Sequence, residues 1–345
     1  MENGPVLLTE GYFLIESFQT DQLFQNKTVK VTNVWLLILM ALGSSQIIAV
    51  HSPPQRSSRP PAQKTRTSDP SDYGPPSQLA LLKDKAVKES SGLAASRRFH
   101  GIYWTHNDSG DGPFIYAFDR RGGNRGVWRV SGAAARDWED IAAGPGPSAG
   151  TNYLYIGDIG DNQEKRADIV VYRVPEPEIS TRSLSKGKAA ATAPSEAIRL
   201  RYPDGSHDAE SLLVHPRTGN IYIITKIAFA SPGIYEAPAP IQAGGVITMN
   251  RVGTLAVPSL FGGIITGGAI SPDGRRVAFC DYMQGYEAVL QNGSLSFDTI
   301  WKRPLTTISL GSRKQGEAIT YRLDSKALLM TSEGSPMPLF QVERR

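Results

Sequence analysis

From about residue 78 to the end of the chain, short runs of hydrophobic residues alternate with turns rich in glycine, proline and aspartate. Such runs are typical of β-strands, and few of them have the spacing of an amphipathic helix. The 34 glycines and 24 prolines in 345 residues also favour many short strands joined by turns. We therefore expect an all-β fold.

One short pattern recurs five times in this region. It is an acidic or small residue followed by small and apolar residues, at 89–93, 139–142, 210–213, 268–271 and 317–320. After each copy comes a turn and then a β-rich run that ends in a polar residue, at 103–108, 153–158, 221–226, 277–281 and 328–333. A third strand follows in every unit and a fourth in all but the last, so the chain is built from repeated units.

A strand before the first repeat, at residues 79–88, can supply the outer strand that the last unit lacks. Four-stranded units arranged radially, with both termini in one unit, make a β-propeller, and ring closure protects its strand edges. The sequence therefore predicts a five-bladed β-propeller closed by an N-terminal strand. A six-bladed ring stays open if the longer units contain a further blade, and an open β-sandwich is the other alternative.

The first fifty residues have the features of an export signal. An apolar run at 34–42 follows Lys27 and Lys30 and precedes small residues. We expect residues 1–50 to be a signal peptide or a membrane anchor, because the apolar stretch is at the short edge of what spans a bilayer. Residues 51–77 are rich in proline, serine and arginine, which predicts a disordered linker before a propeller domain at 78–345.

We therefore expect a secreted or periplasmic protein, or one held at the membrane by residues 34–50. Most of the net charge of +4 lies before the propeller region, which interleaves both signs. A nucleic-acid partner is not expected from such a pattern. The single Cys280 excludes an internal disulfide and a cysteine-rich zinc site. We expect a monomer that meets the membrane only through its N-terminal segment.

Propeller geometry brings the two repeated patterns together at one end of the channel. The first strand of a blade lines the channel and the second runs antiparallel beside it, so the start of one lies next to the end of the other. Lys226 is the only basic residue that the repeat places there. The candidate metal ligands at this mouth are Glu89, Asp108, Asp111, Glu139, Asp158, Asp161, Glu210, Asp281, Glu317 and Glu333.

So many carboxylates at one mouth need a counter-charge. At about 6 Å and an effective dielectric constant of about 20, each like-charged pair costs roughly 2 to 3 kcal/mol. Two loops share the motif Asp-x-Gly-Asp, at 108–111 and 158–161. Clustered oxygens on glycine turns suit a hard cation, and we predict that the cofactor is Ca²⁺. The alternative is that the acids accept backbone hydrogen bonds, fastening blades and capping turns.

Four segments, at 89–93, 104–110, 137–142 and 155–162, resemble a group of exported bacterial β-propeller proteins of unassigned function. More distantly, the chain is similar to esterase-like and phytase-like propellers, a resemblance that implies an acidic mouth binding Ca²⁺ and phosphate esters.

Two functions remain as expectations. The first is a recognition module that binds a small molecule, a polymer or an envelope protein at the channel mouth. The second is a metal-dependent hydrolase of esters or phosphoesters. In a hydrolase the reaction needs proton transfer and a group that positions the substrate anion. The candidate catalytic residues for these roles are His106, His207, Lys226 and Glu317.

Overall fold

The computed structural model describes residues 72–345, except 109, 180–184 and 260–261. The chain divides into two units, Met1–Thr65 and Arg66–Arg345, and the described residues belong to the second. The predicted signal segment and most of the predicted linker lie outside the described residues. Within the described ranges, no helix is long and apolar enough to cross a membrane.

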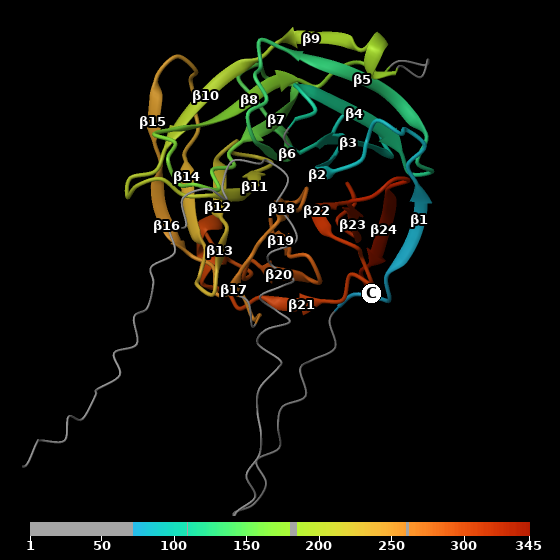
Figure 1. The fold of residues 1–345 in the computed structure, drawn as a ribbon. Helices are drawn as coiled ribbons and strands as arrows, with labels where there is room; N and C mark the ends of the chain where they lie inside the picture. The colour runs from blue at the N-terminus through green and yellow to red at the C-terminus, as the bar shows by residue number, and fades with distance from the viewer. Residues whose placement is uncertain (1–71, 109, 180–184, 260–261) are drawn as a thin grey trace, which may run out of the picture. The chain divides into compact units, whose positions relative to one another are not determined.

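Five sheets stand around a common axis and form a β-propeller (Figure 1). The innermost strands of blades 1 to 5 are β2 (Ser90–Ala95), β6 (Trp138–Pro145), β11 (Ala209–Val214), β18 (Gly267–Ile270) and β22 (Gly316–Tyr321). The second strands are β3 (Ile102–Asn107), β7 (Asn152–Asp158), β12 (Ile221–Thr225), β19 (Arg276–Cys280) and β23 (Ala327–Ser332). The third strands are β4 (Phe114–Asp119), β8 (Ile169–Pro175), β14 (Gly233–Ala237), β20 (Gly285–Val289) and β24 (Pro338–Glu343). The prediction of a five-bladed all-β propeller is confirmed, and the six-bladed and sandwich alternatives are wrong.

The outer strands differ from blade to blade. The fourth strands of blades 1 to 4 are β5 (Asn124–Ser131), β10 (Glu196–Arg201), β16 (Asn250–Thr254) and β21 (Thr306–Ile308). Blades 1 and 2 each gain a fifth strand, β9 (Ala190–Pro194) and β15 (Val246–Thr248), which add in parallel and cover the outer edge. A two-stranded ribbon, β13 (Ile227–Ala228) with β17 (Gly262–Gly263), links blades 3 and 4. Two short 3₁₀ helices complete the described elements, η1 (Lys186–Lys188) and η2 (Phe297–Lys302).

The ring closes through the N-terminal strand, as predicted. Strand β1 (Ser77–Leu81) pairs antiparallel with β24 and forms the outer strand of blade 5. It begins two residues earlier than the predicted range of 79–88 and ends sooner. After the strand the chain turns at Asp84, whose carboxylate accepts the N–H of Ala86 (2.9 Å). The hydroxyl of Tyr73, just before β1, donates to Glu287 Oε1 of blade 4 (2.7 Å). The closing segment is therefore tied to two blades.

The hydrophobic core lies between neighbouring blades and is divided among five seams. Strand β12 shows how one strand serves two seams: Ile221 and Ile223 pack against blade 2, whereas Tyr222 and Ile224 pack against blade 4. Alternate side chains of a strand point to opposite faces, so a strand buried on both faces needs a continuous apolar run. This packing explains the uninterrupted hydrophobic runs of the sequence.

Buried polar contacts join the inner strands across the seams. The carboxylate of Asp140 in blade 2 accepts the N–H of Ile141 (2.8 Å) and of Leu212 in blade 3 (3.0 Å). Burial raises the pKa of this carboxyl well above its usual value. Further seam contacts are Ser91 Oγ to the Glu139 carbonyl (2.8 Å), Thr266 Oγ1 to the Gly316 carbonyl (3.0 Å) and Ser90 Oγ with Thr331 Oγ1 of β23 (2.9 Å).

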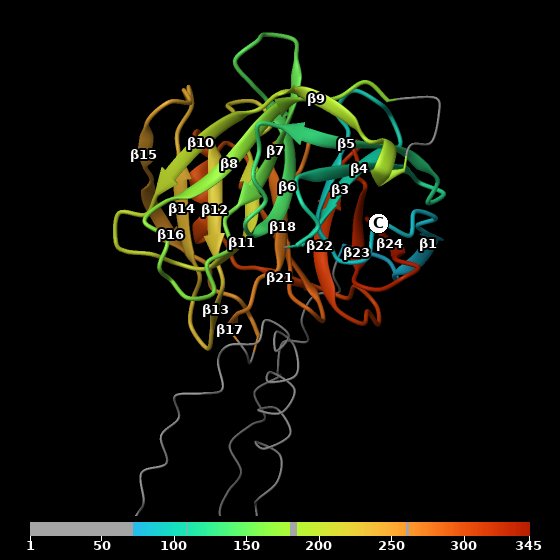
Figure 2. The same cartoon turned by 45° about the horizontal axis from the view of Figure 1, so that its top comes forward.

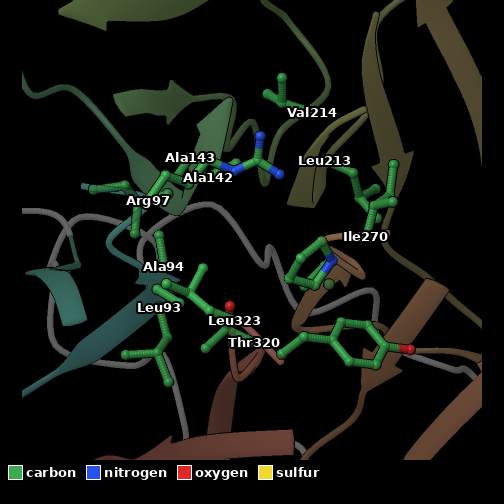
Figure 3. Close-up of a pocket in the computed structure, with 16 residues that line it drawn as sticks. Leu93, Ala94, Arg97, Ala142, Ala143, Leu213, Val214, Ile270, Thr320 and Leu323 are labelled. Atoms are coloured by element: carbon green, nitrogen blue, oxygen red, sulfur yellow. The ribbon is translucent and has the colours of Figure 1, made fainter. Parts of the chain in front are cut away.

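The channel is filled rather than open. Side chains from all five inner strands surround a cavity of about 40 Å³, which has room for no more than a few water molecules (Figure 3). Leu93, Ala142 and Leu213 are among its small and apolar walls. Arg97 also lines this cavity, and its guanidinium donates to the carbonyl of Pro216 in blade 3 (3.0 Å).

Closure can be tested by deletion. Removing residues 72–82 takes away β1, exposes the edge of β24 and opens the core between blades 5 and 1. We expect the free energy of unfolding in urea to fall by several kcal/mol, a large part of the stability of an ordinary domain, and the protein to aggregate in light-scattering measurements. Deleting residues 55–65, within the predicted linker, is the matched control and should change neither. Near-native stability after the first deletion would contradict closure by β1.

Candidate acidic site at the channel mouth

The acidic mouth depends on a β-bulge repeated in four blades. In blades 1, 2, 3 and 5 the pairing of the inner strand with the second strand skips one residue, and the skipped residues are Ser91, Glu139, Glu210 and Glu317. A bulge inserts one extra residue and re-aims its side chain. Three glutamates therefore occupy equivalent positions at the start of the inner strands. The sequence comparison that aligned Glu89 with them is wrong, since Ser91 holds this position in blade 1.

Blade 4 has no bulge, and its inner strand begins with glycines. A Cβ on Gly267 would lie 2.6 Å from the carbonyl oxygen of Glu317 in blade 5. Glycine is therefore required for the close approach of these two blades, and this part of the mouth carries no glutamate.

The predicted meeting of the first and second strands is confirmed by backbone hydrogen bonds. The N–H of Asp108 donates to the Glu89 carbonyl (3.0 Å), and the N–H of Glu333 donates to the Gln315 carbonyl (2.9 Å). In blade 3, the N–H of Lys226 donates in the same way to Asp208 (2.9 Å). The ends of the second strands thus lie beside the segments that lead into the inner strands.

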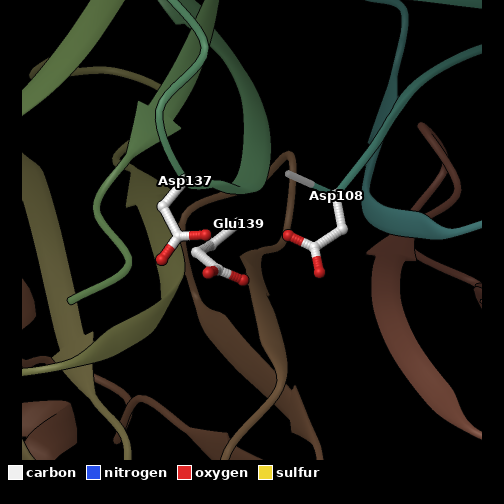
Figure 4. A group of neighbouring side chains, drawn as sticks. All are labelled: Asp108, Asp137 and Glu139. Atoms are coloured by element: carbon white, nitrogen blue, oxygen red, sulfur yellow. The ribbon is translucent and has the colours of Figure 1, made fainter. Parts of the chain in front are cut away.

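Three carboxylates converge at the seam between blades 1 and 2 (Figure 4). Asp108 follows β3 of blade 1, whereas Asp137 and Glu139 stand at the start of β6 in blade 2. Each of the three offers one oxygen, and these oxygens lie within 4.8 Å of one another. Gly160 closes the group on one side, because a Cβ there would lie 2.2 Å from Glu139 Oε1 and 2.6 Å from Asp137 Oδ2. We call Asp108, Asp137 and Glu139 the carboxylate triad.

Burial and mutual repulsion make these acids hard to ionise. Burial raises the pKa of Glu139 well above its usual value, and the nearby charges of Glu210 and Asp108 raise it further. The pKa of Glu317 is also raised well above normal, by burial and then by Glu333 and Glu210. Burial and the charge of Glu89 raise the pKa of Glu333. The mouth therefore favours protons or cations.

Lys226 forms an ion pair with one acid of the mouth, and its charge also offsets part of the repulsion at Glu139. Its ammonium group forms an ion pair with Glu210 and lies 3.1 Å from the hydroxyl of Tyr282 in blade 4. Burial lowers the Lys226 pKa, but Glu210 and Tyr282 together raise it above its usual value. Burial and Glu210 raise the pKa of Tyr282 to about 12. The ammonium group of Lys226 is thus held by Glu210 and Tyr282.

Asp158 faces away from the mouth. Its carboxylate accepts the N–H groups of Arg136 and Asp137 (3.2 Å each) and pairs with Arg166 (2.8 Å). Asn107 does the same in blade 1, where its Oδ1 accepts two backbone N–H groups. Asp158 is therefore the equivalent of Asn107, and its predicted alignment with Asp108 is wrong by one residue. A shift of one residue turns a strand side chain to the opposite face.

Three other predicted ligands are held by local contacts. Asp161 accepts the N–H of Arg166 (2.6 Å) within its own loop. Asp111 pairs with Lys186 (2.6 Å) and accepts a hydrogen bond from Tyr116 (2.8 Å). Asp281 accepts the N–H groups of Met283 and Gln284 (2.7 Å each). The contacts of Asp161 and Asp281 match the alternative in which acids cap turns, whereas Asp111 is held by side chains.

The two histidines also have local partners. His106 is buried with its Nδ1 2.9 Å from the Asn107 carbonyl, and its ring stacks edge-on against Trp138 at 5.7 Å. Burial lowers its pKa. His207 Nε2 lies 3.0 Å from Asp204 Oδ1 and 3.0 Å from the hydroxyl of Tyr235, which belongs to the third strand of blade 3.

Sequence reasoning missed Asp137 as a candidate ligand. The signal was present, because Asp137 and Glu139 flank Trp138 in the second repeat. In a regular strand, two residues separated by one share a face. The intervening bulge made their exact directions unpredictable, and the repeat comparison gave weight to Asp158 instead.

Comparison with known proteins does not place the chain in a family. No family model matches it, and no curated relative matches it. Among solved structures it is similar to hydrazine synthase of Kuenenia stuttgartiensis, with 9% identity over 70% of this chain and a TM-score of 0.34. The match covers 61% of the hydrazine synthase chain. A Dos1 propeller matches with 8% identity over 77% of this chain and 95% of its own, again with a TM-score of 0.34.

The raised pKa of Glu139 predicts how stability depends on pH. Below the usual glutamate pKa, the folded and unfolded chains both hold the proton. As the pH rises above it, the unfolded chain loses the proton first, so the free energy of unfolding falls until the folded-state pKa is passed. Without added cations, wild-type protein should lose about 1.4 kcal/mol for each unit by which that pKa is raised.

Glu139→Gln should flatten this part of the curve. The lowered pKa of His106 acts in the opposite direction, destabilising the fold as the pH falls, but it is common to both proteins. The difference between their urea-unfolding curves, measured in EDTA from pH 4 to pH 8, therefore reports the ionisation of Glu139 together with its effect on the neighbouring acids. Parallel curves for wild type and variant would show that Glu139 ionises normally in the folded protein.

Proposed function

We propose that this chain is an exported β-propeller that acts as a recognition module. We also propose that its acidic mouth binds a divalent cation, with Ca²⁺ as the first candidate. The observation that carries the proposal is the carboxylate triad, whose oxygens lie within 4.8 Å of one another. Calcium takes oxygen ligands at about 2.3 to 2.6 Å, so two oxygens on one ion lie at most about 5 Å apart. The proposal of export rests on the apolar segment and the proline-rich linker.

The chemistry of the triad supports a hard cation. All three donors are carboxylates, which favour Ca²⁺, Mg²⁺ or Mn²⁺ over metals that prefer nitrogen or sulfur. The charge of Glu210 adds to that of the triad, although its ion pair with Lys226 offsets part of this. A divalent cation would relieve the repulsion that raises the pKa of Glu139. Three protein carboxylates leave further coordination positions for water or a ligand.

Recognition accounts for the placement of the polar groups better than hydrolysis does. A general base must reach the proton that it removes, directly or through one water. His106 is buried against Trp138, and His207 is engaged by Asp204 and Tyr235. The ammonium group of Lys226 is held by Glu210 and Tyr282. Glu317, the fourth candidate, is buried and accepts a hydrogen bond from Gln315 (2.6 Å).

Thermal unfolding tests the cation site. A ligand that binds only the folded chain stabilises it by about 2.7 kcal/mol at one hundred times its Kd, which for a domain of this size raises Tm by roughly 5 °C or more. Added Ca²⁺ should therefore raise Tm and EDTA should lower it. Asp137→Asn and Glu139→Gln should each abolish the response.

Glu178→Gln is the control for these variants, because Glu178 is exposed and pairs with Arg98 away from the triad. This variant should respond to Ca²⁺ as the wild type does. A Tm that neither Ca²⁺, Mg²⁺ nor EDTA changes would contradict the proposal. An equal response in wild type and Asp137→Asn would place the cation elsewhere.

A further inference from the structure

Exposed hydrophobic side chains gather on one part of the acidic mouth. Six large hydrophobic side chains are exposed among the described residues, and three of them stand in two loops at this mouth. Ile227 (41% exposed) directly follows Lys226 in blade 3, Phe229 (78%) comes two residues later, and Met283 (71%) follows Tyr282 in blade 4. Exposed apolar side chains that cluster beside polar groups commonly mark an interaction site.

The two loops lie together. The ammonium group of Lys226 approaches the Tyr282 hydroxyl to 3.1 Å, which joins the loop of blade 3 to that of blade 4. The β13–β17 ribbon carries Ile227 and leads directly to Phe229, and in Figure 2 it extends beyond the ends of the neighbouring blade strands. A hollow of about 250 Å³ adjoins Phe229, Ser231 and Val257. The surface thus has exposed apolar side chains and a hollow beside one of them, Phe229.

The backbone holds Phe229 in an unusual conformation. Its φ of +60° is uncommon for any residue other than glycine and is unfavourable for a large side chain. Such strain persists only where the surrounding structure enforces it, and it occurs preferentially at functional sites. An exposed aromatic ring presented in this way needs an explanation beyond packing.

The neighbouring blade supplies negative charge. The start of the blade 5 inner strand lies beside the loop that carries Met283, since the Gly316 N–H donates to the Tyr282 carbonyl (3.4 Å). Burial raises the pKa values of Glu317 and Glu333, and the charges of Glu333 at Glu317 and of Glu89 at Glu333 raise them further. Lys314 offsets part of this charge at Glu333. Because blades 4 and 5 are adjacent, acidic and apolar side chains share one side of the mouth.

We propose that this side of the mouth is a docking surface for a protein segment in which a Lys or Arg side chain lies next to large apolar side chains. The basic group would pair with Glu333, which is half-buried with the buried Glu317 behind it, and the apolar groups would cover Phe229 and Met283. The charge decides the class of ligand: an anion would be repelled, and an uncharged apolar ligand would desolvate carboxylates without pairing them. This inference rests on the recognition part of the proposed function, and it needs neither Asp137 nor Glu139.

The test compares three synthetic peptides by calorimetry with the full-length protein. Acetyl-Leu-Lys-Phe-Lys-Leu-amide should bind. Acetyl-Leu-Glu-Phe-Glu-Leu-amide, which reverses the charge, and acetyl-Ser-Lys-Gly-Lys-Ser-amide, which lacks the apolar groups, should each bind at least tenfold more weakly. Equal binding of the acidic peptide would overturn the proposal.

A double variant, Phe229→Asn with Met283→Gln, removes the apolar groups while asparagine tolerates the positive φ. Burying one such side chain strengthens binding by about tenfold or more. The affinity of the double variant for the basic apolar peptide should therefore fall by at least that factor. Leu295→Gln alters another exposed hydrophobic residue and should leave binding unchanged. Equal affinity of the double variant and the wild type would overturn the proposal.

Asp137→Asn separates this inference from the cation site. That variant should keep the peptide affinity of the wild type even when it has lost its response to Ca²⁺. Loss of peptide binding in Asp137→Asn, with the double variant unaffected, would move the docking site to the triad and contradict the inference.

Discussion

The pairing of β1 with β24 is the constraint on which the structure depends. Each blade buries apolar residues on both faces, so no blade is stable without a neighbour on each side. An open ring would leave the core between blades 5 and 1 exposed. Closure also fixes the positions of the five inner strands around the axis. The relative positions of acids that are distant in sequence, such as Glu139 and Glu317, follow from it.

A repeated architecture produces an asymmetric mouth because the repeats differ at a few positions. The bulge carries serine in blade 1 and glutamate in blades 2, 3 and 5, and blade 4 has glycine instead. Lys226 neutralises the glutamate of its own blade. The triad therefore collects at the seam of blades 1 and 2, and the exposed apolar loops belong to blades 3 and 4. One scaffold thereby presents two chemically different surfaces side by side.

The architecture could be predicted from the sequence because the pattern that indicates it occurs five times. Five copies of one pattern, and an extra strand predicted at 79–88 for a last unit that lacked one, favoured five blades and closure by the N-terminal strand, which the structure has at 77–81. The added strands β9 and β15 were not predictable, since parallel pairing at an outer edge depends on where long connections happen to run.

The site was harder to predict than the fold because a single-residue shift reverses the direction of a strand side chain. Glu139, Asp108 and Lys226 were placed correctly at the mouth, since they lie at strand ends whose pairing the topology fixes. Asp158 was misplaced by one residue and instead holds the backbone of the segment before β6. Neither Asp137 nor the exposed Phe229 followed from the repeat, because each depends on local backbone geometry that only the folded chain has.

We propose that the seam between blades 1 and 2 assembles a cation site from carboxylates of both blades. Elemental analysis of full-length protein, dialysed against calcium and then against calcium-free buffer, tests this claim most directly. We predict about one Ca²⁺ per chain in the wild type and essentially none in Asp137→Asn, because the triad supplies the carboxylate oxygens that this ion requires. Equal calcium content in the two proteins, or none in the wild type, would contradict the account.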